Sequence, residues 1–548
     1  MTTLPPENPL RAGMAEELSV DPCVLTIFGA SGDLTGRKLV PGVYALSKNR
    51  MLPSAFALVG FARRPMSDAD LVGKMRLAVD QFAREKPVDS AVWDDLANGM
   101  AYVQGAFDEP AAYERLKAKL DELDERRGTR GGRTFYLAVP PESVAGIVEN
   151  LVRAGLCPPP GQGDRPYARV VVEKPFGIDL ESARKLNREL LALLDERQIF
   201  RIDHYLGKET VQNLLVLRFG NTIFEPLWNR NHVSHVEITV AEHIGVEGRG
   251  KFYEQTGLMR DIVQNHALQL LSLVAMEAPV AWDADAVRDE KVKALRALRP
   301  MAGTEDVRAR TVRAQDAGGV VRGDAVRAYR EEPDVAPGSE VETFVALEAR
   351  VDNWRWADVP FYLRAGKRLE KRVTEIALHF KPLPHPLFDT NDSLGQPNSL
   401  FRASNPTRAS RCASPRRSGA GRLAMRDVAM DFRYGMAFGH EDPEAYERLL
   451  LDAMRGDATL FTVRRGRGRG RFVDPIMSAW RDNTVPLATY PSGSWSPEEA
   501  HQLVHETAVT SGANRDQRQS IPWPASSASS ARFGGRCRQR RRSLAPRP

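Results

Sequence analysis

Short hydrophobic runs alternate with amphipathic stretches through the first two hundred residues. Apolar runs rich in β-branched residues predict four buried strands, over residues 23–28, 55–61, 134–139 and 168–172. Apolar residues at helical spacing among charged ones predict helices, over residues 113–123, 143–154 and 180–196. Strands that alternate with helices are typical of a parallel sheet covered on both faces. We therefore expect a doubly wound α/β domain of the Rossmann type over residues 21–200.

The pattern changes after residue 200. Residues 233–242 alternate polar and apolar positions as a half-buried strand does, and residues 259–276 predict a largely apolar helix. Later strand candidates follow one another without long helices between them, over residues 343–351, 361–364 and 375–380. Such a succession favours an antiparallel sheet. We expect a second, α+β domain with a large antiparallel sheet over residues 201–519, which binds substrate and mediates dimerisation.

Length and composition fit this two-domain arrangement. A chain of 548 residues is too long for one ordinary core, and 42% hydrophobic with 27% charged residues is typical of globular proteins. An apolar run near 18 residues is absent, so we expect no membrane span, and the start of the chain lacks the order of a secretory signal. Four cysteines without a C-x-x-C pair argue against a disulfide scaffold and favour the cytoplasm.

The net charge of +6 is concentrated in two segments. Residues 399–424 hold six arginines and residues 520–548 hold seven, with no acidic residue in either, and the rest of the chain carries −7. We therefore expect no nucleic-acid partner for the folded body. Residues 1–20 and 520–548 are expected to be disordered ends.

The arginine-rich segments 399–424 and 464–471 interrupt the strand pattern. Their Arg, Ser, Pro and Gly bias, which residues 520–548 share, suggests the hypothesis of translation in a shifted reading frame in all three stretches, and the alternative is that they are genuine basic disordered insertions. In either case the second sheet is expected to lose strands.

A glycine turn follows the first strand and opens a helix. Residues 29–34 (GASGDL) place glycines where a backbone can approach a pyrophosphate, although the spacing is not G-x-G-x-x-G and a plain loop is the alternative. The second strand ends at Arg63 and Arg64, where an NAD site usually carries an acid. Because an arginine there accommodates a 2′-phosphate, we predict NADP, with Arg63 as the main ligand. A basic strand end that faces water is the alternative.

Polar chemistry is concentrated in residues 201–209 (RIDHYLGKE), which hold two acids, two fixed cations, a histidine and a phenol. Such a cluster suits an anionic polar substrate, with a solvated charged turn as the alternative. His266 lies in the apolar helix that opens with Arg260 and Asp261; it is either a core histidine or a functional one. Lys174 follows a strand at the edge where open α/β sheets bind ligands.

Four motifs in order resemble the glucose-6-phosphate dehydrogenase family: GASGDL (29–34), EKPFG (173–177), RIDHYLGKE (201–209) and RDIVQNH (260–266). The resemblance runs over residues 21–395 and resumes from 426 to about 510. It implies NADP-dependent oxidation of glucose 6-phosphate at C1 to the 6-phosphogluconolactone. It also implies a Rossmann domain joined to a domain with a large antiparallel sheet, and a homodimer or homotetramer.

The resemblance assigns roles to individual residues. It makes His266 the general base and Asp203 the group that holds its imidazolium. The implied substrate ligands are Lys174, His204, Tyr205, Lys208, Glu242, Asp261, Lys367 and Arg372. The implied cofactor ligands are Gly29, Ala30, Ser31, Gly32, Asp33, Leu34, Lys38, Arg63 and Lys174. We expect no metal, because His232-x-x-His235 has no third ligand patterned around it.

Three other functions fit parts of the sequence. One is an oxidoreductase of the same two-domain type that acts on another sugar or sugar acid. The second is an NADP-binding protein that is catalytically impaired, since the second sheet looks damaged. The third is a nucleic-acid-binding protein that acts through its arginine-rich tail.

Overall fold

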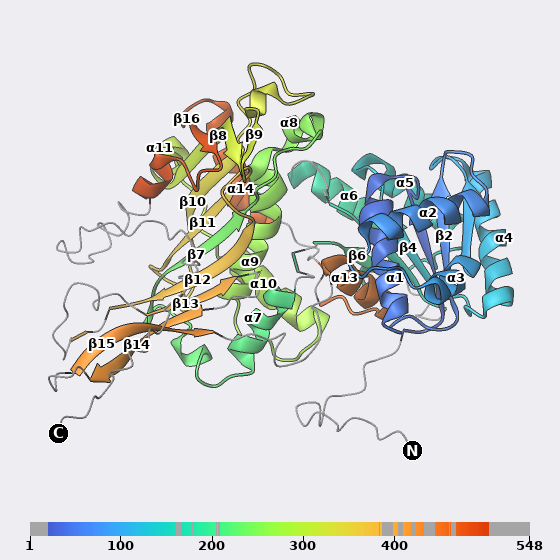
Figure 1. The fold of residues 1–548 in the computed structure, drawn as a ribbon, viewed down its shortest axis with the longest axis horizontal. Helices are drawn as coiled ribbons and strands as arrows, with labels where there is room; N and C mark the ends of the chain where they lie inside the picture. The colour runs from blue at the N-terminus through green and yellow to red at the C-terminus, as the bar shows by residue number, and fades with distance from the viewer. Residues whose placement is uncertain are drawn as a thin grey trace, which may run out of the picture.

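The structure, a computed structural model, describes residues 20–160, 166–174, 176, 180–203, 205–206, 209–382, 384–385, 398–403, 409–417, 423–431, 444–459, 461 and 467–503. The expected disordered ends fall outside the described residues, apart from Val20, and so do His204 and Lys208. The described chain forms two bodies, each built on one sheet (Figure 1). Among the described residues, no helix is long and apolar enough to cross a membrane.

The first body contains sheet A, whose six strands are all parallel. They are β1 (Cys23–Phe28), β2 (Phe56–Ala62), β3 (Met100–Gln104), β4 (Arg133–Leu137), β5 (Ala168–Val172) and β6 (Ile199–Arg201). The order β3-β2-β1-β4-β5-β6 reverses direction between β1 and β4, which is where open α/β sheets bind ligands. The predicted Rossmann fold is confirmed, although β3 and β6 were not predicted.

Helices and short turns connect these strands. They are η2 (Thr35–Leu39), α1 (Val40–Lys48), α2 (Asp68–Phe82), α3 (Ser90–Asn98), α4 (Pro110–Arg127), α5 (Pro141–Arg153), α6 (Leu180–Leu193) and η3 (Glu196–Gln198). A capping box and a left-handed glycine define two of the helix ends. Ser67 and Asp70 form a capping box at the start of α2, and Gly128 ends α4 at φ +74°.

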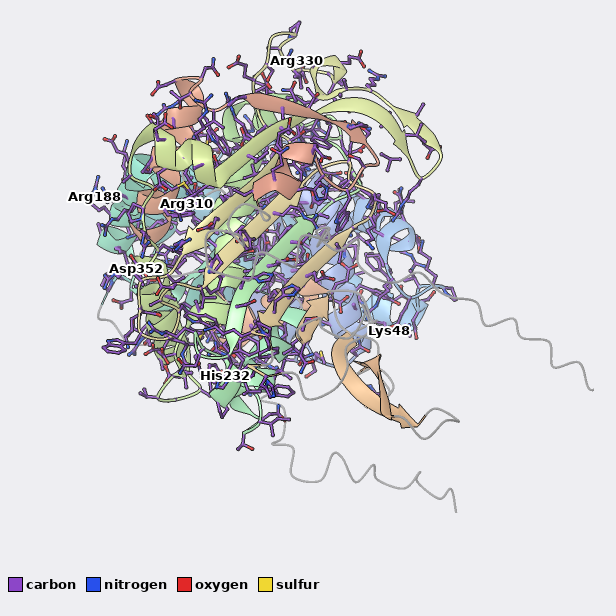
Figure 2. The ribbon with its side chains drawn as sticks, turned by 90° about the vertical axis from the view of Figure 1, so that its left-hand side faces the viewer. Lys48, Arg188, His232, Arg310, Arg330 and Asp352 are labelled. Atoms are coloured by element: carbon purple, nitrogen blue, oxygen red, sulfur yellow. The ribbon has the colours of Figure 1, made fainter. Side chains whose placement is uncertain are left out.

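The second body contains sheet B, in the order β15-β14-β13-β12-β7-β11-β10-β8-β16, with β9 paired to β8. Its strands are β7 (Val233–Ala241), β8 (Thr311–Val321), β9 (Asp324–Val326), β10 (Phe344–Arg350), β11 (Pro360–Gly366), β12 (Val373–Phe380), β13 (Ser399–Ala403), β14 (Ala409–Arg417), β15 (Leu423–Asp431) and β16 (Leu487–Ser492). Most neighbours are antiparallel, but β7 pairs with β11 and β8 with β16 in parallel. The predicted large antiparallel sheet is thus confirmed with a mixed character. Figure 2 looks onto these strands, with the first body behind them.

The remaining helices accompany sheet B. They are α7 (Glu209–Phe219), η4 (Glu225–Leu227), α8 (Gly250–Leu258), η5 (Met259–Ala267), α9 (Leu268–Ala275), α10 (Ala284–Arg296), α11 (Gly303–Arg310), η6 (Tyr329–Glu331), α13 (Ala445–Arg455) and α14 (Arg467–Arg481). The apolar face of the central strands packs on η5 and α9, so that Ile238 and Leu363 share one core with Leu271. The helix predicted over 259–276 is therefore present and buried.

The expectation that the arginine-rich segments remove strands from the sheet is wrong for the described residues. β13 pairs with β12, β14 pairs with β13 and β15 pairs with β14, so residues 399–403, 409–417 and 423–431 extend sheet B. Residues 467–471 begin α14. The frame-shift hypothesis is a statement about the gene and stays a hypothesis.

Helix α13 crosses back from the second body to the first (Figure 1). It contacts α1 and β5, and an added Cβ on Gly42 of α1 would lie 3.6 Å from Leu450. The Arg169 guanidinium of β5 donates to the carbonyls of Ala453 and Met454 at the end of α13. The residues expected in the second domain therefore include a helix that completes the core of the first.

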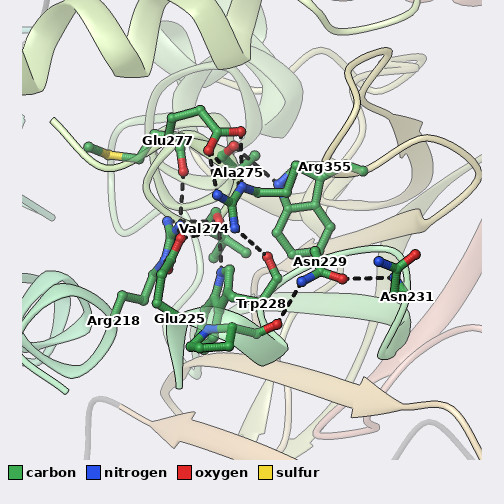
Figure 3. A network of polar contacts seen from close by, with 12 residues as sticks. Arg218, Glu225, Trp228, Asn229, Asn231, Val274, Ala275, Glu277 and Arg355 are labelled. Atoms are coloured by element: carbon green, nitrogen blue, oxygen red, sulfur yellow. Dashed lines mark hydrogen bonds and ion pairs between the residues drawn. The ribbon is translucent and has the colours of Figure 1, made fainter. Parts of the chain in front are cut away.

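The buried side chain of Arg218 donates hydrogen bonds to carbonyls at the end of α9 (Figure 3). Arg218 is 0% exposed, and its guanidinium donates to the carbonyls of Leu273 and Val274 at 2.8 and 3.0 Å, and to that of Met276 at 2.9 Å. Glu225 accepts from the same guanidinium at 3.1 Å. Since the last carbonyls of a helix lack intrahelical partners, Arg218 supplies donors to those of Leu273 and Met276, and it shares that of Val274 with the indole of Trp228.

Candidate active site

Polar side chains from both bodies meet at the carboxyl edge of sheet A. Lys174 follows β5 and Asp203 follows β6, while His266 comes from η5 of the second body. The side chains of Asp203 and His266 are only 3% and 0% exposed. The two halves of the chain therefore contribute to one buried polar cluster.

Gly257 and Glu342 set the start of η5. Gly257 adopts φ +58°, and a Cβ there would lie 2.4 Å from Glu342 Oε1. The same Oε1 accepts the N–H of Met259 at 2.9 Å, which satisfies a donor at the start of the helix. From Met259 to Ala267 the helix has wide π-type turns, a form that recurs at functional sites.

His266 contacts an acid through one ring nitrogen and a cation through the other. Its Nδ1 lies 2.6 Å from Asp203 Oδ1, and its Nε2 lies 2.8 Å from Lys174 Nζ. Lys174 Nζ also donates to Asp261 Oδ1 at 3.1 Å. Since an ammonium group can only donate, Nε2 accepts and the ring proton is on Nδ1, pointing to Asp203.

Burial and charge together keep this histidine neutral. Burial has the largest effect and lowers the pKa of His266; Asp203 opposes it and Lys174 adds to it. For Asp261 burial alone would raise the pKa, but Lys174 and Lys367 outweigh it and lower the pKa to about 2. The site thus combines a neutral imidazole, the form that can take up a proton, with an ionised Asp261 carboxylate that holds Lys174.

Four further residues that were predicted to bind the substrate lie around the cluster of Lys174, Asp203 and His266. The Tyr205 ring stacks on His266 with centroids 4.0 Å apart, and its backbone N–H donates to Asp203 Oδ1 at 3.0 Å. Lys367 Nζ lies 2.5 Å from Glu242 Oε2. Exposed Arg372 interacts electrostatically with Tyr205.

The predicted glycine turn forms a tight cradle between β1 and β4. Gly29 has φ +84°, and a Cβ there would lie 2.3 Å from the carbonyl oxygen of Ala138. The N–H of Gly32 donates to the Gly29 carbonyl at 2.9 Å, which closes the turn. A side chain at position 29 would collide with the backbone that follows β4, so the turn needs glycine there to keep this shape.

Cations lie beside this turn. Arg63 and Arg64 are exposed past the end of β2, as predicted from the sequence. Lys74 of α2 was not predicted: its Nζ donates to the Ser31 carbonyl at 2.8 Å, and it interacts electrostatically with Arg64. The capping box at Ser67 could have revealed the start of α2 and hence a lysine two turns along it, near the turn. Lys38 forms an exposed ion pair with Glu444 at 2.9 Å.

Two family models match the chain. One, described as the glucose-6-phosphate dehydrogenase NAD binding domain, matches residues 26–213. The other, described as the glucose-6-phosphate dehydrogenase C-terminal domain, matches residues 215–511. Their boundary falls within α7, shortly after the end of sheet A.

Relatives match over nearly the whole chain. A protein named glucose-6-phosphate 1-dehydrogenase 2 from Mycobacterium tuberculosis is 44% identical over 505 residues, which is 91% of this chain and 96% of the relative. A glucose-6-phosphate 1-dehydrogenase from Chlamydia pneumoniae is 42% identical over 501 residues, 90% of this chain and 96% of the relative.

Solved structures match to the same extent. A glucose-6-phosphate dehydrogenase in complex with its substrate glucose-6-phosphate has a TM-score of 0.79 at 32% identity and covers 90% of this chain and 99% of its own. The enzyme from Mycobacterium avium has a TM-score of 0.73 at 38% identity and covers 89% and 98%. Since the matches include both sheets and the cluster between them, the chain belongs to the glucose-6-phosphate dehydrogenase family.

Proposed function

We propose that this chain oxidises glucose 6-phosphate at C1 to 6-phosphoglucono-1,5-lactone with NADP as the hydride acceptor. The observation that carries the proposal is the buried, neutral His266 held between Asp203 and Lys174 where the two bodies meet. Family membership over both domains supports the same reaction. It also disfavours a different sugar substrate or a purely binding role.

His266 is the proposed base. Its Nε2 takes the proton of the C1 hydroxyl, and for this the hydroxyl replaces the Lys174 ammonium at Nε2 while Lys174 keeps its contact with Asp261. Asp203 then holds the imidazolium through Nδ1, which fixes the ring and stabilises the charge that forms. The stack of Tyr205 on the ring keeps it in plane for this transfer.

The residues at the edge of sheet A fit a phosphorylated dinucleotide. The glycine turn at Gly29 follows β1 at the carboxyl edge of the sheet, and Arg63, Arg64 and Lys74 offer cations for a 2′-phosphate. NADP, when bound, supplies the acceptor for the hydride from C1. Lys74 adds to the cofactor ligands proposed from the sequence.

We propose that the phosphate of the substrate is held by the cluster that includes His204 and Lys208, with Glu242, Asp261, Lys367 and Arg372 on the rest of the sugar. A dianionic phosphate suits imidazole and ammonium donors. His204 and Lys208 lie outside the described residues, so this part rests on the sequence.

The direct test follows the absorbance of reduced NADP with glucose 6-phosphate as substrate. Turnover by the wild-type chain and its loss in His266→Gln are expected. Binding of NADP without turnover would support the impaired homologue instead. Lys208→Ala should raise KM for glucose 6-phosphate far more than KM for glucose, and an equal rise for both would contradict the phosphate role.

We also propose a cytoplasmic homodimer or homotetramer that associates through the second body. Trp354 and Val280 of that body are 95% and 96% exposed, and association would cover such apolar side chains. The described Cys23 and Cys157 are buried free thiols, as a reducing compartment would keep them. Sedimentation of the purified chain measures the assembly, and a monomer at micromolar concentration would contradict it.

A further inference from the structure

Two histidines and a glutamate converge on sheet B, far from the proposed active site. His379 of β12 lies directly opposite His235 of β7, and Glu237 follows two residues along β7 on the same face. This end of β7 lies seven residues from Glu242, roughly 20 Å at about 3.3 Å per residue. The cluster is therefore separate from the residues proposed for the dehydrogenase reaction.

The three side chains present their ligand atoms to one another. His235 Nε2 and His379 Nε2 lie 3.6 and 3.7 Å from the same oxygen, Glu237 Oε1, and all three atoms lie within 4.8 Å of one another. Both separations are longer than an ordinary hydrogen bond. The two rings are stacked, with centroids 4.3 Å apart and planes 8° from parallel.

Ser234 is a further contact of His235. Its hydroxyl lies 2.9 Å from His235 Nδ1 and 3.2 Å from the His379 carbonyl oxygen. When the hydroxyl donates to that carbonyl, Nδ1 carries the hydrogen and Nε2 turns a lone pair toward the Glu237 carboxylate, which is the tautomer that a bound cation selects. The hydrogen bond at Nδ1 is also the outer contact that orients histidine ligands in metal sites.

Fixed cations lie near the cluster, which remains open to solvent. Arg364 interacts electrostatically with both Glu237 and Glu375, and Lys371 interacts with Glu375. The side chain of Glu237 is 4% exposed, whereas those of His235 and His379 are 21% and 17% exposed, which leaves a route from solvent. A buried carboxylate beside partly open imidazoles is a suitable donor set for an ion that enters from the surface.

We propose that His235, Glu237 and His379 bind a divalent transition-metal ion of the Zn²⁺ class. Two imidazole nitrogens and one carboxylate oxygen are a known zinc donor set, and two ligands of one tetrahedral zinc lie about 3.4 Å apart. The 3.6 and 3.7 Å separations are close to this value. The two rings are now nearly parallel, so the proposal requires each ring to turn about its soft χ2 torsion until both lone pairs meet one ion. Water would complete the coordination.

The site ties β7 to β12 and has no part in the proposed hydride transfer. Its ligands come from residues 144 apart in the chain, which explains why the sequence predicted no metal: His232-x-x-His235 has the spacing, but the strand register supplies His379 instead. His232 is exposed near the end of sheet B, where Figure 2 labels it.

Metal binding to the whole chain tests the proposal. After treatment with EDTA and its removal, Zn²⁺ is titrated by calorimetry and bound metal is counted by elemental analysis. One ion per chain is expected, with a rise in Tm as zinc is added. Glu237→Gln keeps the shape of the side chain and should weaken binding at least about tenfold, as should His379→Ala. His232→Ala is the matched control and should bind zinc like wild type.

Co²⁺ provides a second measurement that needs no variant. The wild-type chain should give visible absorption bands of four- or five-coordinate cobalt with nitrogen and oxygen ligands, and without the thiolate bands that a cysteine would cause. Circular dichroism in EDTA checks that each variant is folded. The weak spectrum of hydrated cobalt, the absence of stoichiometric zinc, or equal weakening in His232→Ala would each overturn the proposal.

Discussion

Two neighbours of His266 shift the pKa of its imidazole in opposite directions. Asp203 holds the proton on Nδ1 and raises the pKa of the ring, while burial and Lys174 lower it. Because burial is the largest effect, the ring stays neutral at neutral pH and can take a proton. The effects of Asp203 and Lys174 can be separated by substitution, because each substitution should change a different kinetic quantity.

Asp203→Asn should lower kcat/KM for glucose 6-phosphate by about 10³- to 10⁴-fold, because an amide can donate to Nδ1 and leave the hydrogen on Nε2. Affinity for NADP should change little, since Asp203 contacts the histidine and not the glycine turn. Steady-state kinetics and NADP titration measure the two effects. Comparable losses in both would mean that the substitution disturbs the fold and not the tautomer.

Lys174→Gln should move the acid limb of the pH profile. The base works only when deprotonated, so activity falls as pH drops through the pKa of His266. Lys174 lowers that pKa, and its removal therefore raises it and shifts the limb of kcat/KM to higher pH. Profiles of wild type and variant over pH 5–8 give the comparison. A limb that stays in place would show that Lys174 does not influence the base.

At the scale of elements, the sequence predicted segments whose hydrophobic pattern has a clear period. The strands near residues 23–28 and 168–172 and the helix over 259–276 are present, because each buries an uninterrupted apolar face. β8 was missed because its sequence, TVRAQDAGGVV, mixes polar residues and glycines. The first residue of η5, Met259, donates its N–H to Glu342, 83 residues away, a contact that no local pattern contains.

The same limit applies to individual site residues. Lys174, Asp203 and His266 were predicted because each lies in a motif, whereas Lys74 reaches the glycine turn only through the packing of α2. His379 meets His235 only through strand register. Site residues that lie in a local motif could be predicted from the sequence, whereas site residues that meet only through tertiary packing could not.

Arg218 should be one of the most sensitive positions in the second body. Arg218→Ala leaves the buried carbonyls of Leu273 and Met276 without this donor, while that of Val274 keeps Trp228, so it should lower the free energy of unfolding by about 3 kcal/mol. Arg299→Ala removes an ion pair with Asp352 in which both side chains are about half exposed, and should cost less than about 1 kcal/mol. Urea unfolding of both variants measures the difference. Equal midpoints would contradict the capping role.

At the scale of the whole molecule, the two bodies are joined by more than the chain between β6 and α7. Helix α13 comes after all but one strand of sheet B in the sequence, yet packs on α1 and β5 of sheet A. Phe461, just beyond it, packs edge-on against Phe200 of β6 with centroids 4.9 Å apart. The first body is therefore complete only when a segment from beyond residue 440 is in place. This arrangement also holds Lys174 and Asp203 in a fixed position relative to η5.

A fragment of residues 20–213 should consequently be poorly soluble, although it holds all six strands of sheet A. Without α13 it exposes the apolar surface of α1 that Leu450, 1% exposed in the whole chain, now covers. A second fragment, in which residues 444–461 follow residue 213 through a flexible glycine and serine linker, should be soluble and should bind NADP. Gel filtration and fluorescence titration of the two fragments make the comparison.

Leu450→Asp in the linked fragment should return it to the behaviour of the shorter one, because a charge cannot be buried against α1 without a partner. If residues 20–213 alone are soluble and bind NADP equally well, α13 merely rests on the first body and does not complete its core.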